Sequence, residues 1–255
     1  SGDLRPASSR YRDFSKINFR VTVEPEEHKT YWLRISTSSS LQLPITLYSE
    51  LAFGDAAAKE SSKNSFLYGI FVVMIIINTL LFLNLRDPNY LPYLLYLTTF
   101  LMTLSTLNGT TGQTLLPNLP GLANLLLPAS VALAFVGGLL FSRNFLSCAW
   151  RMPRLTTAMD VFTGLFILLA VLSFVAPYRT VMIPTVVLGV FVPFMIIAAG
   201  LAAYRDGLGP ARTFLLAWTA LMAGVLLYLL KTLGVLPSSF ITDQGIQIGS
   251  ALQVT

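Results

Sequence analysis

Few side chains in this sequence have the types and spacing that catalysis or metal binding requires. The chain has one histidine, His28, and one cysteine, Cys148. A Ser-His-Asp arrangement needs a histidine base beside a nucleophile, yet His28 lies in the charged stretch EPEEHKT and is predicted to be a solvated loop residue. Arg151 could lower the pKa of the Cys148 thiol, although a small structural residue is the simpler interpretation. The counts exclude a Cys/His zinc site and an intrachain disulfide, and we predict no catalytic residue and no cofactor.

Two charged residues fall inside apolar stretches, where charge is costly and therefore informative. Asp160 is expected to hydrogen-bond within a helix bundle or to lie at an interface near Arg154. Lys231 lies near the end of another apolar stretch and is expected to extend its amine to polar headgroups. Both are candidate transduction or helix-packing residues.

Small and helix-bending residues are the other candidates. Gly245 and Gly249 are four residues apart, so in a helix they share one face and permit close approach of a second helix, within a bundle or across a dimer. Pro184 and Pro193 lie in one apolar stretch and can bend it because they lack backbone donors, as Pro128 can in another. Ordinary packing explains these residues as well as a moving part does.

The composition is that of a membrane protein. Of the 255 residues, 54% are hydrophobic and 11% are charged, and the mean hydropathy is +0.67, which is outside the range of soluble globular domains. The net charge is +5 without a clustered basic face, so nucleic acid is not an expected partner.

From Phe66 onward the sequence consists of apolar runs near the roughly 20 residues that span a hydrocarbon core. Seven runs predict an all-α bundle of seven membrane helices with short connections. The predicted helices are Phe66–Leu85, Leu91–Leu107, Ala123–Phe141, Thr157–Val175, Val181–Tyr204, Thr213–Val235 and a seventh that starts at Asp243.

Residues 1–53 have the alternating apolar pattern of β-strands. The pattern predicts three strands, near Ile17–Val23, Tyr31–Ile35 and Leu41–Leu47. Because three strands cannot close a sandwich core alone, residues 1–53 are expected to be the C-terminal part of an all-β domain. Residues 54–65 are then a polar linker or short helix.

The loop charges predict the orientation of the bundle. If the N-terminus is outside, the inner connections hold Arg86, Arg143, Arg151, Arg154, Arg205 and Arg212, whereas the outer side holds Arg179 and Lys231. This asymmetry favours an outer N-terminus and a cytoplasmic C-terminus. No signal sequence opens the chain, and the seventh helix is too short to cross the core, so both ends are expected to continue in a longer protein.

The chain resembles the bacterial 7TM receptors with diverse intracellular signalling modules, the 7TMR-DISM family. The resemblance rests on YWLRISTSSSLQLPITLYS (31–49), NTLLFLNLRDPNYLPYLLY (78–96), FSRNFL (141–146), RDGLGPARTFLLAW (205–218) and QIGSALQVT (247–255). The family commonly has an acidic residue where Gln253 stands here. The resemblance implies an outer jelly-roll-like domain that binds a small molecule or carbohydrate, a transducing bundle, and an output module, most often a diguanylate cyclase or histidine kinase, which this chain does not contain.

We therefore expect a transmembrane receptor of the bacterial inner membrane, working as a homodimer in the lipid bilayer. A transporter or channel is the alternative, but it predicts inverted repeats and more charges within the membrane. A membrane-embedded enzyme lacks a catalytic pair, because Asp160 has no histidine or cysteine partner in the apolar runs.

Overall fold

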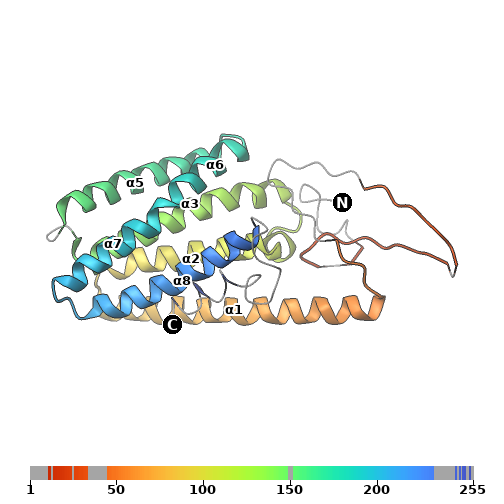
Figure 1. Cartoon of the computed structure of the whole chain (residues 1–255), viewed down its shortest axis with the longest axis horizontal. Helices are drawn as coiled ribbons and strands as arrows, with labels where there is room; N and C mark the ends of the chain where they lie inside the picture. Colours follow the sequence, from red (N-terminus) through yellow and green to blue (C-terminus); the bar gives the residue numbers. More distant parts are fainter. Residues whose placement is uncertain are drawn as a thin grey trace.

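The computed structural model describes residues 11–12, 14–24, 26–33, 45–148 and 152–232, together with residues 245, 247, 249, 250 and 253. Long helices run side by side in alternating directions, and the N-terminal segment, residues 11–33 and 45–49 as far as described, lies at one end of them (Figure 1). We call this the near end of the bundle and the opposite one the far end. The helices in chain order are α1 (Glu50–Leu85), α2 (Tyr90–Leu107), the π-helix η2 (Thr111–Leu115), α3 (Pro120–Phe145), α5 (Pro153–Leu172), α6 (Tyr178–Gly189), α7 (Phe191–Arg205) and α8 (Pro210–Thr232).

Helix α1 begins well before the apolar run that predicts it. Ser49 caps its N-terminus, where the side chain accepts a hydrogen bond from the Ala52 N–H at 3.3 Å. Residues 54–65, predicted as a linker or short helix, are helical and continuous with the apolar run. The 36 residues of α1 correspond to about 54 Å at 1.5 Å per residue, whereas a hydrocarbon core is about 30 Å thick. Helix α1 is therefore a rod that extends past the bundle at the near end.

Helix α3 lies at the centre of the bundle, in contact with α2, α5, α6 and α7. Its closest contact is with α2, where a Cβ on Gly137 would lie 2.5 Å from the backbone nitrogen of Tyr96. Such an approach of two backbones requires glycine. Helix α1 packs chiefly against α2, and large apolar side chains on its remaining faces, such as Phe66 and Leu83, are exposed and suited to lipid.

The predicted fifth span, Val181–Tyr204, is two helices rather than one. Helices α6 and α7 meet at Val190, and together they form one apolar segment, Tyr178–Arg205. Pro193 explains the break, because a proline ring clashes with the carbonyl four residues earlier, which here belongs to Gly189. Helix α6 passes through Pro184 without interruption. Of the predicted bending residues, Pro193 lies next to a break, whereas Pro184 and Pro128 lie inside the continuous helices α6 and α3.

Among the described residues, five segments are long and apolar enough to cross a membrane, namely Glu50–Leu85, Tyr90–Leu107, Leu125–Phe145, Pro153–Leu172 and Tyr178–Arg205. These correspond to the first five predicted spans, and α8 corresponds to the sixth. Of the predicted seventh span, the described residues Gly245, Gln247, Gly249, Ser250 and Gln253 are all helical, and we call them the last helix. The chain is a multi-pass membrane protein.

The N-terminal segment contains no strand among its described residues. Residues 17–24 and 26–33 are two irregular runs joined by a turn in which the Glu27 N–H donates to the Glu24 carbonyl at 3.1 Å. The turn lies where the sequence predicts it, but the described residues of the first two predicted strands show no backbone pairing. A strand exists only by pairing, and an isolated pair is marginally stable. Most of the third predicted strand lies outside the described residues.

Candidate functional site

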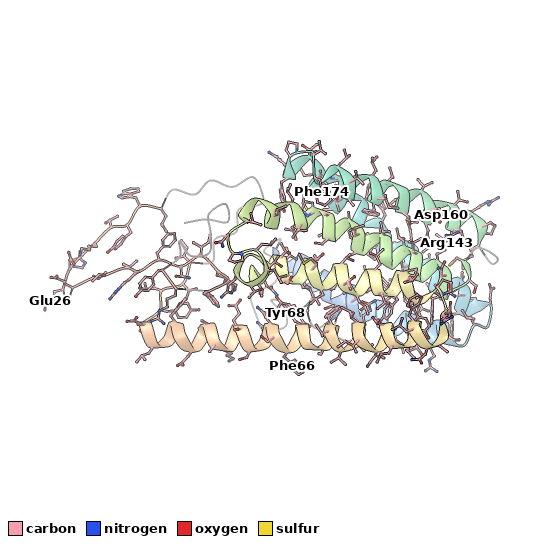
Figure 2. All side chains as sticks on the ribbon, turned by 180° about the vertical axis from the view of Figure 1, so that it is seen from behind. Glu26, Phe66, Tyr68, Arg143, Asp160 and Phe174 are labelled. Atoms are coloured by element: carbon pink, nitrogen blue, oxygen red, sulfur yellow. The ribbon has the colours of Figure 1, made fainter. Side chains whose placement is uncertain are left out.

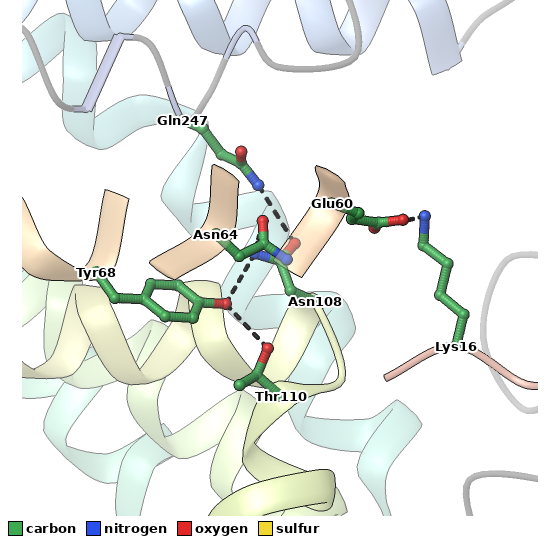
Figure 3. A network of polar contacts seen from close by, with 7 residues as sticks. All are labelled: Lys16, Glu60, Asn64, Tyr68, Asn108, Thr110 and Gln247. Atoms are coloured by element: carbon green, nitrogen blue, oxygen red, sulfur yellow. Dashed lines mark hydrogen bonds and ion pairs between the residues drawn. The ribbon is translucent and has the colours of Figure 1, made fainter. Parts of the chain in front are cut away.

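A network of polar side chains lies at the near end of the bundle (Figure 3). Asn108 is its centre. Asn108 Nδ2 donates to the Tyr68 hydroxyl at 3.0 Å and to Asn64 Oδ1 at 3.5 Å, and Asn108 Oδ1 accepts from Gln247 Nε2 at 3.3 Å. The Tyr68 hydroxyl also lies 3.2 Å from Thr110 Oγ1. One set of hydrogen bonds thus joins α1, the turn after α2, and the last helix.

The turn that carries Asn108 is shaped by its sequence. Helix α2 ends at Leu107, and the Asn108 N–H donates to the Leu104 carbonyl at 3.0 Å. Gly109 then adopts a φ of +76°, a region that glycine enters without strain. Helix η2 follows, and its buried Thr111 Oγ1 lies 2.7 Å from Ser105 Oγ. π-Helical turns occur frequently at functional sites.

The N-terminal segment contacts two of the parts that this network joins, namely α1 and the turn after α2. Lys16 Nζ lies 2.6 Å from Glu60 Oε1 on the extension of α1. The carbonyl oxygen of Ser15 packs against Gly109, where an added Cβ would lie 2.5 Å from it. Exposed ion pairs contribute little to stability, so the backbone approach at Gly109 is the more specific contact.

A second polar contact lies deeper in the bundle. The Tyr96 hydroxyl donates to Gln253 Oε1 at 2.5 Å, and the two residues are 3% and 8% exposed. The Tyr96 ring also faces the Trp218 ring of α8 at 5.9 Å between centroids and lies beside Gly138 of α3. Tyr96 therefore contacts α3, α8 and the last helix.

The structure places Gly245 and Gly249 against α8. A Cβ on Gly249 would lie 2.8 Å from the Ala220 carbonyl oxygen and 3.0 Å from Leu221 Cα. A Cβ on Gly224 of α8 would overlap the Gly245 carbonyl oxygen. The close approach predicted for these two glycines is thus made within the bundle, to a glycine of the preceding helix.

Asp160 pairs with a residue of a neighbouring helix. Its Oδ1 lies 3.3 Å from Arg143 Nε, at the far end of the bundle from the N-terminal segment (Figure 2). Arg143 occupies the last turn of α3, so Asp160 has a partner within the helix bundle, which is the first of the two expectations from the sequence. Both side chains are partly exposed, so the pair is expected to contribute at most about 1 kcal/mol.

The remaining predicted candidates are not part of these networks. Pro184 lies in α6, and Pro193 lies in the first turn of α7. Lys231 lies in the last turn of α8, and its side chain lies outside what the structure describes.

Sequence patterns alone do not single out Tyr68, Tyr96, Asn108 or Gln247 as site residues. One signal was available: polar side chains in apolar helices are costly unless they are paired. Most threonines in these helices bond to a carbonyl of their own helix, as Thr79 does with Ile75 at 2.7 Å. Tyr96 and Gln253 instead bond across 157 positions of sequence, which periodicity cannot reveal.

His28 and Cys148 have surroundings that do not suit catalysis. His28 is exposed, as predicted. Cys148 lies in the connection between α3 and α5, is fully buried, and has its sulfur 3.9 Å from the Ser142 carbonyl oxygen. Burial raises the pKa of the Cys148 thiol, and the nearby Arg143 charge lowers it to a smaller extent. The thiol is therefore expected to be inert.

Labelling of Cys148 tests this expectation. At neutral pH the folded protein is expected to react with N-ethylmaleimide at least about tenfold more slowly than the SDS-denatured chain, because only the thiolate reacts. The raised pKa means that the rate in the folded protein continues to increase above the pH at which the denatured rate levels off. Cys148→Ser removes the single cysteine and is the blank. Equal rates in both states would show that the thiol is accessible.

No group of His, Cys, Asp and Glu residues that could hold a metal ion occurs among the described residues. The hydrogen bond from Gln247 to Asn108 and the close backbone contacts of the glycines tie the last helix to the rest of the bundle, which gives this region the character of a helix-coupling site.

Comparisons with known families agree with this character. The family described as 7TM diverse intracellular signalling matches residues 60–255, and the family described as 7TMR-DISM extracellular 2 matches residues 1–49. No curated protein and no solved structure matches the sequence. The first match covers most of the chain and confirms the resemblance noted from the sequence motifs. The chain therefore belongs to the 7TMR-DISM family of transmembrane signalling receptors.

Proposed function

We propose that this chain is the sensing and transducing region of a receptor in the bacterial inner membrane. The near end, with the N-terminal segment, lies outside the cytoplasm, and the far end, with Arg86, Arg143 and Arg205, faces the cytoplasm. We propose that an output module follows the last helix and that it is a diguanylate cyclase with a GGDEF domain or a histidine kinase. The chain itself performs no catalysis.

The contact path from the N-terminal segment to the last helix carries this proposal. Ser15 packs against Gly109, and the adjacent Asn108 bonds to Gln247. Lys16 pairs with Glu60 on α1, which also provides Asn64 and Tyr68 to the network (Figure 3). A displacement of the N-terminal segment therefore reaches the last helix through Asn108 and its neighbours.

The proposed receptor function also implies a class of ligand and an oligomeric state. Residues 1–49 match an extracellular domain, and we propose that this domain completes a jelly-roll-like β-sandwich that binds a small molecule or carbohydrate. A signal of this kind shifts an equilibrium between two helix arrangements. We further propose that the receptor acts as a homodimer, because such outputs commonly require two copies.

A transporter is the second candidate, because the break at Val190 resembles the interrupted helices of transporters. At this break, however, the Val190 N–H still donates to the Val186 carbonyl at 3.1 Å. This backbone donor at the break is therefore occupied within the helix. Substrate uptake by liposomes containing this chain alone would favour the transporter.

Replacement of Asn108 by leucine tests the receptor. A reporter diguanylate cyclase is joined after Thr255, and its product is measured per amount of folded protein in the membrane. Asn108→Leu keeps the size of the side chain and removes the bonds to Tyr68 and Gln247. The loss of such bonds is expected to change reporter output about threefold to tenfold.

The matched control is Asn84→Leu. Asn84 is exposed on α1, and its Nδ2 donates to the Leu80 carbonyl of the same helix. Output is expected to remain at the wild-type level in this variant. Equal output from both variants, with equal amounts of folded protein, would contradict the proposed route.

A further inference from the structure

Tyr96 occupies a position in α2 from which it contacts three other helices. Gly137 of α3 allows the Tyr96 backbone to approach closely, and Trp218 of α8 faces its ring. Its hydroxyl reaches Gln253 in the last helix. Because these contacts surround the Tyr96 ring, the direction of its hydroxyl is fixed by α3 and α8.

The described residues of the last helix pack on α8 through glycines. Its contact with α8 is made by Gly245 and Gly249 against Gly224 and the neighbouring backbone. Because glycines have no side chains that interlock with the neighbouring helix, this contact by itself provides no directional bond that fixes the last helix along its axis.

Gln253 continues the same stripe of the last helix. Residues 245, 249 and 253 recur at intervals of four, which keeps them within an arc of about 80° on a helix. Of the described residues on this stripe, Gln253 is the one with a directional bond to another helix. Gln247, which bonds to Asn108, lies on a different side.

We propose that Tyr96 is the residue that positions the last helix along α8, and that its hydrogen bond to Gln253 is a latch whose release lets this helix shift on the glycine contact. The inference rests on the proposed receptor function and adds the point of regulation. The Asn108 network receives the signal at the near end, and the Tyr96 latch determines whether the last helix moves in response.

The strength of the latch suits a switch. A neutral hydrogen bond changes a conformational equilibrium by roughly threefold to tenfold, so a modest event at the near end can overcome it. A buried ion pair at this position would be harder to break, because each separated charge would remain without a partner. The pair found here, a tyrosine hydroxyl and an amide, carries no charge.

Three variants separate positioning from packing. Tyr96→Phe and Gln253→Leu each remove one partner and leave the other buried without a bond, which destabilises the protein. The double variant removes both and is expected to restore the thermal unfolding midpoint. Tyr93→Phe is the control, because this ring stacks on Tyr96 at 6.4 Å and, within the described residues, its hydroxyl has no hydrogen bond.

Two readouts follow the last helix. The first is the reporter cyclase joined after Thr255. The second is labelling of Ser250→Cys by N-ethylmaleimide in a Cys148→Ser background, because Ser250 is fully buried in the last helix. Ser142→Cys, at an equally buried position in α3, controls for general loosening of the bundle.

A latch predicts that the double variant, although as stable as the wild type, labels at Ser250→Cys about fivefold faster and shows reporter output changed by a similar factor. Labelling at Ser142→Cys and all properties of Tyr93→Phe stay at the control level. Wild-type labelling at Ser250→Cys in the double variant would overturn the proposal and leave Tyr96 a packing residue. The reporter output could instead be unchanged in Asn108→Leu while the labelling rate of Ser250→Cys is altered in the double variant. This result would count against the receptor function and support the latch.

Discussion

Gly224→Ala is expected to displace the last helix from α8 and to destabilise the protein by about 1–3 kcal/mol. The added methyl would overlap the Gly245 carbonyl oxygen and lie close to Gly249 Cα. Both neighbours are backbone atoms, so no side chain can rotate to make room. The last helix must then move away as a unit and take Gln253 out of reach of Tyr96.

Unfolding of the purified protein in mixed micelles measures this loss, and labelling of Ser250→Cys reports the displacement. Gly164→Ala is the matched control, because Gly164 lies in α5 with nothing within 4 Å of an added Cβ. Alanine is the better helix former, so this control is expected to gain roughly 0.5–1 kcal/mol. The substitution by alanine is thus expected to lower the stability at Gly224 and to raise it at Gly164. Similar stability of the two variants would show that α8 and the last helix are not in close contact.

Gly109→Ala is expected to detach the N-terminal segment from the bundle. Alanine at a φ of +76° costs about 1–2 kcal/mol in backbone strain, and its Cβ would lie 2.5 Å from the Ser15 carbonyl oxygen. The clash is relieved when Ser15 moves away, which breaks the path to Asn108. The reporter is therefore expected to lose its dependence on the N-terminal segment.

Gly207→Ala is the control for the effect of backbone strain alone. Gly207 has a φ of +81°, and an added Cβ there has open space. Trypsin cleavage after Lys16, Arg20 and Lys29 is expected to be faster in Gly109→Ala and unchanged in Gly207→Ala, although both variants lose similar stability from strain. Equal cleavage would mean that the contact between Ser15 and Gly109 does not hold the segment.

The bond between Tyr96 and Gln253 gives a physical reason for an amide side chain at position 253. The family commonly has an acidic residue at this position, and glutamine here accepts a hydrogen bond from Tyr96 without carrying a charge. A carboxylate could accept the same bond, but its burial would cost more. The amide therefore keeps the contact while avoiding the burial of a charge.

The membrane class, the apolar spans and the family could be determined from the sequence alone. Hydropathy identifies spans because a backbone in lipid must satisfy its own hydrogen bonds within a helix, so local composition is sufficient. The same local logic identified the turn at Glu24–Glu27 and the possibility of close packing at Gly245 and Gly249. The helical continuation of α1 through residues 54–65 was one of two local options.

Tertiary structure decided what depends on the identity of a distant neighbour. Gly245 and Gly249 could have faced another helix of the bundle or a second copy, and the structure places them on Gly224. Asp160 could have bonded within the bundle or lain at an interface near Arg154, and the structure pairs it with Arg143 of α3. Tyr96 and Gln253, which look like ordinary residues in their own helices, meet across 157 positions because α3 brings α2 close to α8 and the last helix. Periodicity reports which face of a helix is apolar, but a hydrogen bond between two helices depends on their relative rotation and height, which only the packing of the whole bundle fixes.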